Sequence, residues 1–275
     1  MIKLATIAGS DASGGAGLEA DLKTFEEYGL YGMAAVTVIA AMDPDNNWAH
    51  KVFPVSEDAL RAQLETIFKG VGPSAVKTGM LGTPYALELS REYIETYKIK
   101  NYVLDPVMVC KGAGEALNPE LNAALAEKLL PLARVVTPNL FEAEQLSGIK
   151  NIDTIETMKA AAEIIYKKGG QNVFVKGGAK LPGQSKAIDV FFDGEKFEIV
   201  EAALIKTKWN HGSGCTVAAA ICAGLAWGLS PLESVLRAKK FITESLAHSF
   251  ALNTWVGPGN LSSWRNAFGE QVQRA

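Results

Sequence analysis

The chain has 275 residues, and its 27 Lys and Arg against 30 Asp and Glu give a formal charge of −3. Hydrophobic residues make up 48% and charged residues 21%, a balance that excludes disordered, collagen-like and coiled-coil chains. The near-neutral charge provides no basic surface for nucleic acid or anionic lipid. Three cysteines do not make a disulfide framework, so we expect a reducing, cytoplasmic compartment.

The organisation of the chain indicates one domain over residues 1–275. No Pro/Ser-rich linker, internal repeat or low-complexity tract divides it. The N-terminus lacks the basic and apolar regions of a secretory signal. No apolar run approaches the ~20 residues that a membrane span needs. We therefore expect a protein without a membrane partner.

Short apolar runs alternate with amphipathic helical stretches. The runs predicted as strands are 4–8, 34–41, 75–78, 102–104, 135–137 and 173–176. A first helix is predicted from the spacing of Leu18, Leu22, Phe25 and Tyr28. A second is predicted to begin after Ser56 as N-cap and to bury Leu60, Leu64, Ile67 and Phe68. This alternation favours a parallel sheet with helices on both faces.

The later part of the chain departs from this alternation. Residues 187–192 and 196–200 flank Asp193-Gly194, a turn pair typical of a hairpin, so we expect antiparallel strands at one edge of the sheet. Helices are then predicted from Cys215 to Trp227 and from Pro231 to about Phe250. Because ligands of open α/β sheets bind beyond the carboxyl ends of the strands, the loops at those ends are the candidates for chemistry.

A glycine-rich loop from Gly9 to Gly17 follows the first predicted strand. It has neither the Lys-Ser/Thr of a Walker A loop nor the G-x-G-x-x-G dinucleotide fingerprint. One interpretation is a backbone that approaches a small ligand, with Asp11 accepting a hydrogen bond from it. The other is a flexible turn in which Asp11 or Ser13 caps the next helix.

Three further strand-end loops carry polar residues. Asp105 begins a segment that continues to Gly114, where a carboxylate would suit Mg²⁺; the alternative is a solvated loop with a capping Asp. Lys111 and the glycines beside it would allow a flap that excludes water. Asn139 and Glu142 have the spacing of a capping box, which explains them without function. Lys176 is either a phosphate clamp or an ordinary surface lysine.

The strongest single signal is the segment from Asn210 to Thr216, which opens a helix of small residues. Its glycines let backbone N–H groups converge, and the helix N-terminus adds positive charge, so together they favour an anion site. Cys215 is expected in the first turn, where the helix dipole would lower the pKa of its thiol towards neutrality. The alternative is a buried, inert cysteine.

The remaining cysteine and histidine positions indicate no metal centre. Cys222 lies among alanines about 10 Å further along the same helix, too far to form a disulfide with Cys215, and is predicted to be core. The histidines are isolated in sequence, with no zinc-ligand spacing: His50, His211 and His248.

Taken in order, these loops resemble those of the ribokinase family, in its branch of hydroxymethylpyrimidine kinases and bacterial pyridoxal kinases. The resemblance spans nearly the whole chain and is carried by 6–11, 14–23, 77–81, 105–112, 137–142, 176–178 and 211–216. It implies a three-layer α/β/α sandwich without the β-lid of ribokinase itself. It also implies a homodimer that transfers the γ-phosphoryl group of ATP, with Mg²⁺, to a hydroxymethyl group on a heteroaromatic ring.

The resemblance also implies roles for individual residues. Around the transferred phosphoryl group it places Gly212, Ser213 and Gly214, with Cys215 as base where ribokinases have Asp. Around the vitamin it places Gly9, Ser10, Asp11, Met80, Val107 and His211. Around ATP it places Asn139, Lys176, Gly178 and Gly214, and around Mg²⁺ Asp105 and Glu142.

Two positions bear on the substrate. Met42 stands where pyrimidine kinases usually have a Gln that pairs with the aminopyrimidine, and losing such a polar partner costs discrimination. Cys110 is shared with pyridoxal-kinase-like members, and its thiol could add reversibly to an aldehyde. Both favour pyridoxal, with pyridoxine and pyridoxamine as further substrates. The alternatives are a hydroxymethylpyrimidine (phosphate) kinase and a non-catalytic vitamin sensor.

Overall fold

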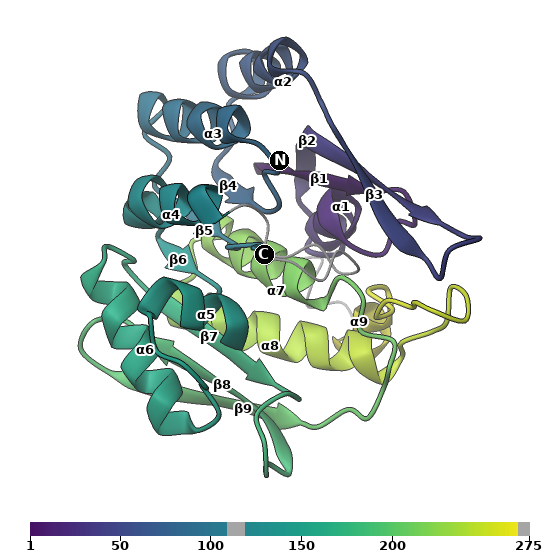
Figure 1. Ribbon diagram of the computed structural model, residues 1–275, viewed down its shortest axis with the longest axis vertical. Coiled ribbons are helices and arrows are strands. Elements are labelled where there is room, and N and C mark those ends of the chain that lie inside the picture. Colours follow the sequence, from purple (N-terminus) through teal and green to yellow (C-terminus); the bar gives the residue numbers. More distant parts are fainter. Residues whose placement is uncertain (109–118, 269–275) are drawn as a thin grey trace.

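The computed structural model describes residues 1–108 and 119–268 as one nine-stranded sheet with helices on both faces (Figure 1). The strands are β1 (Lys3–Asp11), β2 (Tyr31–Asp43), β3 (Ala49–Pro54), β4 (Ala75–Thr78), β5 (Tyr102–Leu104), β6 (Val135–Val136), β7 (Val173–Gly178), β8 (Lys186–Phe192) and β9 (Phe197–Ala203). Their order across the sheet is β3-β2-β1-β4-β5-β6-β7-β8-β9. The six strands from β2 to β7 in that order are parallel, as the alternation in the sequence predicts.

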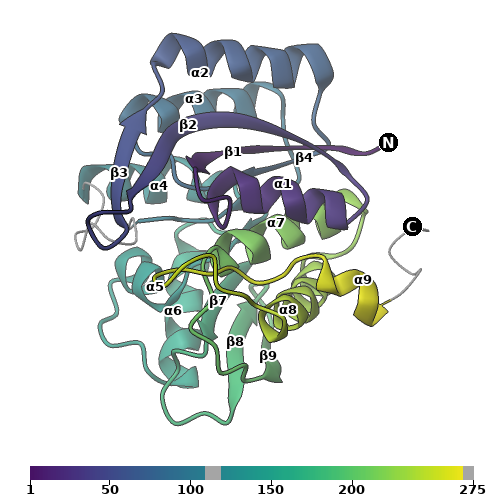
Figure 2. The same cartoon turned by 90° about the vertical axis from the view of Figure 1, so that its right-hand side faces the viewer.

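Two helical layers cover the sheet. One contains α2 (Glu57–Leu64), α3 (Pro84–Thr96), α4 (Pro119–Lys128), α5 (Leu140–Ser147) and α6 (Ile155–Lys167). The other contains α1 (Gly17–Glu27), α7 (Ser213–Ala226), α8 (Pro231–Ala247) and α9 (Ser263–Phe268). Short helical turns follow at η1 (Glu65–Val71) and η2 (Leu130–Leu132). Figure 2 shows α1, α7 and α8 together on one side of the strands. The predicted three-layer α/β/α sandwich is confirmed.

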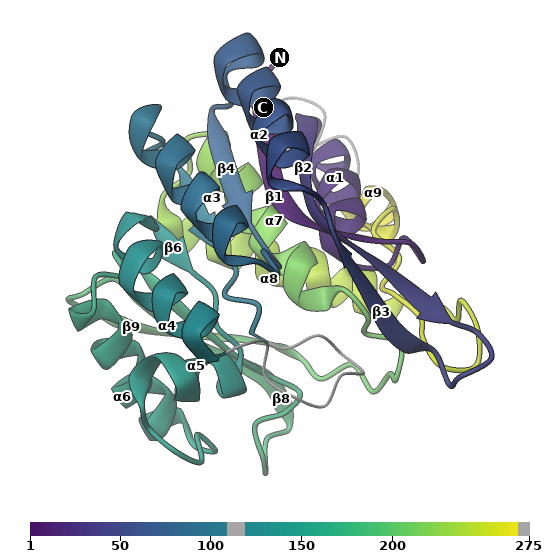
Figure 3. The same cartoon turned by 45° about the horizontal axis from the view of Figure 1, so that its top comes forward.

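Antiparallel strands close both edges of the sheet, although the sequence predicted them at one edge only. The predicted hairpin forms as β8 and β9. At the other edge β3 pairs antiparallel with β2, and the pair extends away from the helical layers (Figure 3). Four of the six β3 residues are exposed, so this strand has no apolar face from which it could be predicted.

Local signals in the sequence fix several helix ends. The Ser56 side chain accepts the N–H of Ala59 and caps α2, as predicted. The helix α7 begins at Ser213, inside the predicted segment, while α8 ends at Ala247 rather than near Phe250. Among the described residues, no helix is long and apolar enough to cross a membrane.

Candidate active site

A row of polar side chains crosses the sheet on the face covered by α1, α7 and α8. On the same face, two residues earlier in each strand, lies an apolar row that packs against these helices and consists of Leu4, Ala75, Val103, Val135 and Phe174. Residues two apart in a strand share a face, so the next residue on that face lies nearer the carboxyl end of each strand. Those residues are Thr6, Lys77, Asp105, Thr137 and Lys176. The fold therefore assembles the charges at the carboxyl end of the sheet.

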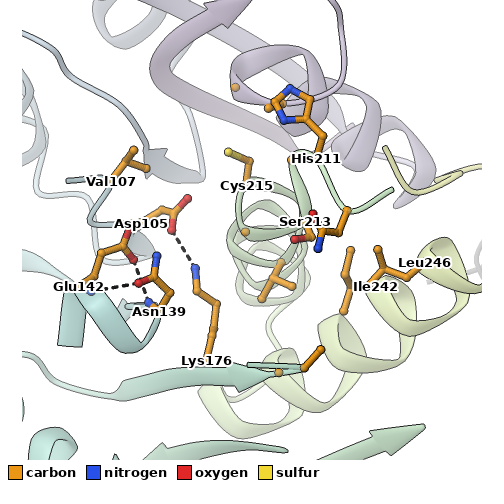
Figure 4. A pocket seen from close by; sticks show the side chains of 18 of the residues that line it. Asp105, Val107, Asn139, Glu142, Lys176, His211, Ser213, Cys215, Ile242 and Leu246 are labelled. Atoms are coloured by element: carbon orange, nitrogen blue, oxygen red, sulfur yellow. Dashed lines mark hydrogen bonds and ion pairs between the residues drawn. The ribbon is translucent and has the colours of Figure 1, made fainter. Parts of the chain in front are cut away.

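A cleft of about 400 Å³ opens above this row. It is lined by every site residue that the sequence predicted, except Cys110. Cys110 and the predicted flap residue Lys111 lie outside the described residues. Figure 4 shows Cys215 and Lys176 pointing into the cleft across from Asp105. Loops that are far apart in sequence thus meet in one place.

Asp105 and Lys176 form the charged centre of the cleft. The Lys176 Nζ donates to Asp105 Oδ1 at 3.1 Å, and both side chains are largely buried, 14% and 3% exposed. Burial opposes a charged Lys176, but Asp105 and Glu142 outweigh it and raise the pKa of the ammonium. Lys176 is therefore a buried cation, and its interpretation as an ordinary surface lysine is wrong.

Glu142 serves both the helix and the cleft. It forms the predicted capping box: its Oε2 accepts the N–H of Asn139 at 2.8 Å, and Asn139 Oδ1 accepts the N–H of Glu142 at 3.0 Å. Burial, with a contribution from nearby Asp105, raises the pKa of Glu142 to about 7, against the opposing effect of Lys176. A cation bound beside Glu142 would lower the pKa of its carboxyl group, because a second positive charge stabilises the ionised form.

The two carboxylates fit a magnesium ion that arrives with a nucleotide. Among residues 1–108 and 119–268, no cluster of three or more His, Cys, Asp and Glu could hold a metal by itself. Mg²⁺ at a nucleotide site needs only one or two protein carboxylates, since phosphates and water complete its shell. Asp105 and Glu142 both line the cleft, lie near each other in Figure 4, and would supply these oxygens.

The N-terminus of α7 lies in the cleft, where the sequence predicted an anion site. Gly212 is the N-cap, with φ of +74°, so Ser213, Gly214 and Cys215 make up the first turn. A Cβ at Gly214 would lie 3.5 Å from Lys176 Nζ, which places the ammonium beside the first turn of α7. Helix dipole and lysine together attract a phosphate.

The thiol of Cys215 does not behave as the sequence predicted. Burial raises its pKa to about 11, although Lys77 acts in the opposite direction. The expected shift towards neutrality is therefore wrong, because desolvation of the thiolate outweighs the stabilising charges around it. The side chain still lies in the cleft, while Cys222 is fully buried among core residues, as predicted.

Asp11 organises the glycine-rich loop. Its Oδ1 accepts from the N–H and the hydroxyl of Ser13, and its Oδ2 accepts from the N–H of Ala16 and from His211 Nε2, at 2.7–2.9 Å. The next helix begins after Ala16 without a side-chain cap, so capping by Asp11 or Ser13 is excluded. A contact between Asp11 and a ligand stays a prediction, and these four bonds add a structural role.

Sequence reasoning missed several residues of the cleft. Lys77 is fully buried against Asp21 of α1. Lys239 of α8 pairs with Asp189 of β8 at 2.6 Å, and Asp189 also accepts the N–H of Gly178. Ile242 and Leu246 add an apolar wall from α8 (Figure 4). Lys77 begins the segment 77–81 that carries the family resemblance, but the resemblance gives it no role; its position two residues after buried Ala75 is the further signal that could have found it.

The fold and this site define a small-molecule kinase of the vitamin-kinase branch. Residues 11–260 match the family described as phosphomethylpyrimidine kinase, and the chain belongs to this family. It is 53% identical to the pyridoxine kinase of Bacillus subtilis over 265 residues, 96% of this chain and 97% of the relative.

The chain is also similar to two kinases that are named for different substrates. The structure of the pyridoxal kinase from Staphylococcus aureus in complex with AMP-PCP and pyridoxal has a TM-score of 0.91 at 46% identity, covering 96% of this chain and 95% of that one. The hydroxymethylpyrimidine/phosphomethylpyrimidine kinase of Bacillus subtilis is more distant, 38% identical over 260 residues, 94% of either chain.

Proposed function

We propose that this protein is a kinase that transfers the γ-phosphoryl group of ATP to the 5′-hydroxymethyl group of pyridoxal, and also of pyridoxine and pyridoxamine. The observation that carries the proposal is the meeting of Asp105, Lys176 and the α7 N-terminus in one cleft. These are the parts needed to hold a nucleotide's phosphates. Relatives at 46% and 53% identity that are named for pyridoxal or pyridoxine supply the substrate class.

On the nucleotide side, Lys176 and the first turn of α7 neutralise the transferred phosphate. Phosphoryl transfer depends mainly on position and on charge neutralisation, so fixed donors account for much of the rate. Asp105 and Glu142 would hold Mg²⁺, which when bound supplies charge neutralisation to the phosphate oxygens. Asn139 fixes Glu142 through the capping box, and Gly178 brings the β7 backbone alongside the nucleotide. Ile242 and Leu246 provide an apolar surface for its base.

On the acceptor side, the cleft residues that we propose to surround the vitamin ring are Gly9, Ser10, Asp11, Met80, Val107 and His211. Cys215 lies beside the anion site, and burial raises the pKa of its thiol to about 11, so the S–H proton must first pass to solvent. The thiolate then takes the proton of the hydroxymethyl group as its oxygen bonds to phosphorus and the bond from phosphorus to ADP breaks. This proton moves late in the transfer, so a thiolate that forms only in part of the molecules is a sufficient base.

Pyridoxal is favoured over hydroxymethylpyrimidine by the side chain at Met42. It lines the cleft from β2 and offers no hydrogen-bond partner to an aminopyrimidine. The second candidate function, hydroxymethylpyrimidine (phosphate) kinase, is favoured by the 38% identical relative that is named for it. Hydroxymethylpyrimidine carries an amino group for which Met42 offers no hydrogen-bond partner, so kcat/KM with each substrate distinguishes the two functions.

We further propose a cytoplasmic homodimer. The β2–β3 pair presents Ile39 and Phe53, which are cross-strand partners and are 45% and 54% exposed. Exposed apolar pairs on an edge hairpin are suited to an interface with a second copy. ATP as donor and the scarcity of cysteine both fit a reducing compartment.

The proposal is tested by incubating the enzyme with Mg²⁺ and ATP and with each of pyridoxal, pyridoxine, pyridoxamine and hydroxymethylpyrimidine. ADP release is followed, and the phosphorylated product is identified by mass spectrometry. We expect a monophosphate of pyridoxal. A protein that binds pyridoxal but releases no ADP with any of the four would be a sensor, which would overturn the proposal.

A further inference from the structure

Lys77 is a lysine without exposed surface, placed in the centre of the sheet beside the cleft. It is the third residue of β4, in register with Thr6 of β1. Its Nζ lies 3.0 and 2.8 Å from the two carboxylate oxygens of Asp21, and the Asp21 side chain is also 0% exposed. The Thr6 hydroxyl donates to Asp21 Oδ2 at 2.6 Å. The ammonium is therefore fixed by the Asp21 carboxylate on the side of α1.

Stability alone does not account for such a pair. Removing two charges from water costs several kcal/mol per ion, and their attraction repays this only in part. Replacing a buried pair by apolar residues of similar size is often neutral or stabilising. The surroundings are already apolar, since Leu4, Ala75 and Val103 pack directly below. An apolar pair could thus complete this core, and the charges point to another role.

The free side of Lys77 faces the reaction centre. Asp105 Oδ2 lies 4.0 Å from Lys77 Nζ, while Asp105 Oδ1 lies 3.1 Å from Lys176 Nζ. The Asp105 carboxylate is thus held between two ammonium groups, one on each side. The charge of Lys77 also reaches Cys215, where it lowers the pKa of the thiol against the larger effect of burial. A single fixed cation therefore acts on both the carboxylate and the base.

We propose that Lys77 is a positioning residue for phosphoryl transfer. Anchored by Asp21, it fixes the Asp105 carboxylate from the side opposite Lys176 and keeps a positive charge beside Cys215. Negative charge builds up between the acceptor oxygen and the phosphoryl group during transfer, and a cation that need not move stabilises it. This inference rests on the proposed kinase function, and it gives a role to Lys77, which begins the segment 77–81 of the family resemblance without an assigned role.

The test is the double variant Lys77→Met/Asp21→Leu, which removes both charges and leaves no unpaired ion in the core. We expect it to fold with an unchanged unfolding midpoint and to bind AMP-PCP within about threefold of wild type, while kcat for pyridoxal falls about 100-fold. Alkylation of Cys215 by iodoacetamide at pH 9, located by peptide mass spectrometry, should slow as well. A structural role would move neither kcat nor alkylation in a well-folded variant.

A matched control removes another ion pair from the same helix. Arg265 donates to both carboxylate oxygens of Glu27 at 2.7 and 2.8 Å, on the α1–α9 side and not in the cleft. We expect Glu27→Leu/Arg265→Met to leave kcat and the alkylation of Cys215 unchanged. If it lowers kcat as much as the Lys77/Asp21 variant does, loss of any α1 ion pair is responsible and the proposal fails.

A second variant serves if the double variant does not fold. Asp21→Asn keeps the shape of the anchor and removes its charge, and we expect kcat to fall about tenfold with an unchanged KM for ATP. A kcat within about threefold of wild type, in either variant, with unchanged alkylation overturns the role of Lys77. A wild type that phosphorylates no vitamer would instead overturn the proposed function, while the alkylation rates would still report on Lys77.

Discussion

The carboxylate of Asp11 and the imidazole of His211 meet at 2.7 Å, although 200 residues separate them. Asp11 belongs to the loop after β1, and His211 directly precedes the N-cap of α7. Their contact therefore joins the loop predicted to hold the vitamin to the turn predicted to hold phosphate. The two halves of the cleft are fixed to each other by one charged hydrogen bond.

Asp11→Asn removes the charge and keeps the shape. Burial favours the neutral acid, but hydrogen bonds from His211 and Ser13 outweigh it and lower the pKa of Asp11 to about 2. A carboxyl whose pKa is lowered by folding stabilises the protein above its unfolded pKa, and this contribution is lost as pH falls towards the folded value. We expect the variant to lose about 2 kcal/mol of unfolding free energy at pH 7.

Urea unfolding at several pH values checks this prediction. The difference between wild type and Asp11→Asn should narrow as pH falls from 6 to 3, because Asp11 becomes protonated in the unfolded chain first. A difference that stays constant over this range would mean that the charge of Asp11 contributes nothing.

Among the glycines that the structure describes, Gly212 is the one at which an added Cβ would have the least room. Its φ is +74°, and a Cβ there would lie 1.9 Å from the carbonyl oxygen of Gly15. Gly228, at the other end of α7, has φ of +89° with nothing within 4 Å, so it serves as a matched control. Gly228→Ala should cost about 1–2 kcal/mol from its φ alone.

Gly212→Ala should cost at least about 2 kcal/mol more than that control, because the loop or the helix must shift. We also expect kcat to fall about 100-fold, since the anion site moves with the turn. Unfolding curves and steady-state rates of the two variants measure both effects. Equal losses of stability would show that the close approach to Gly15 is relieved without cost.

Cys215→Ala tests the base. We expect kcat to fall at least about 100-fold with the Kd of AMP-PCP within about threefold, because the proposed role of the thiol is to take a proton from the acceptor and not to bind the nucleotide. The rate at which iodoacetamide alkylates wild-type Cys215 should rise up to pH 10 without a plateau, since burial raises the pKa of this thiol to about 11. A plateau near pH 8 would support the lower pKa expected from the helix dipole instead.

Cys110→Ala tests the aldehyde hypothesis, which depends on sequence alone because the residue lies outside the described ranges. Only pyridoxal carries an aldehyde to which a thiol can add, so the variant should lose more kcat/KM with pyridoxal than with pyridoxine. Side-by-side kinetics with the two vitamers provide the comparison. Equal losses would remove the aldehyde role from Cys110.

Some of this architecture was readable from the sequence because its signal is local. The boundaries of β4 and β5 agree with the apolar runs, since both strands are buried between two helical layers. The capping box at Asn139 depends only on residues three apart. The strand β3 was missed because its exposed residues form a strand only by pairing with β2.

The electrostatics of the site depend on contacts that no local pattern contains. Lys176 is a buried cation because Asp105 meets it from a position 71 residues earlier. Burial raises the pKa of the Cys215 thiol, and this burial arises only when the chain has folded. It outweighs the lowering by the helix dipole that the sequence predicted. Likewise, Asp21 and Lys77 are 56 residues apart and form a pair only when α1 packs on the sheet.

The most direct measurement of the central claim is the ratio of kcat/KM for pyridoxal to that for hydroxymethylpyrimidine, with Mg²⁺ and ATP at saturating concentrations. Because Met42 gives an aminopyrimidine no hydrogen-bond partner, we predict a ratio of at least about 10 in favour of pyridoxal. A ratio below one would contradict the account and assign the cleft to the pyrimidine.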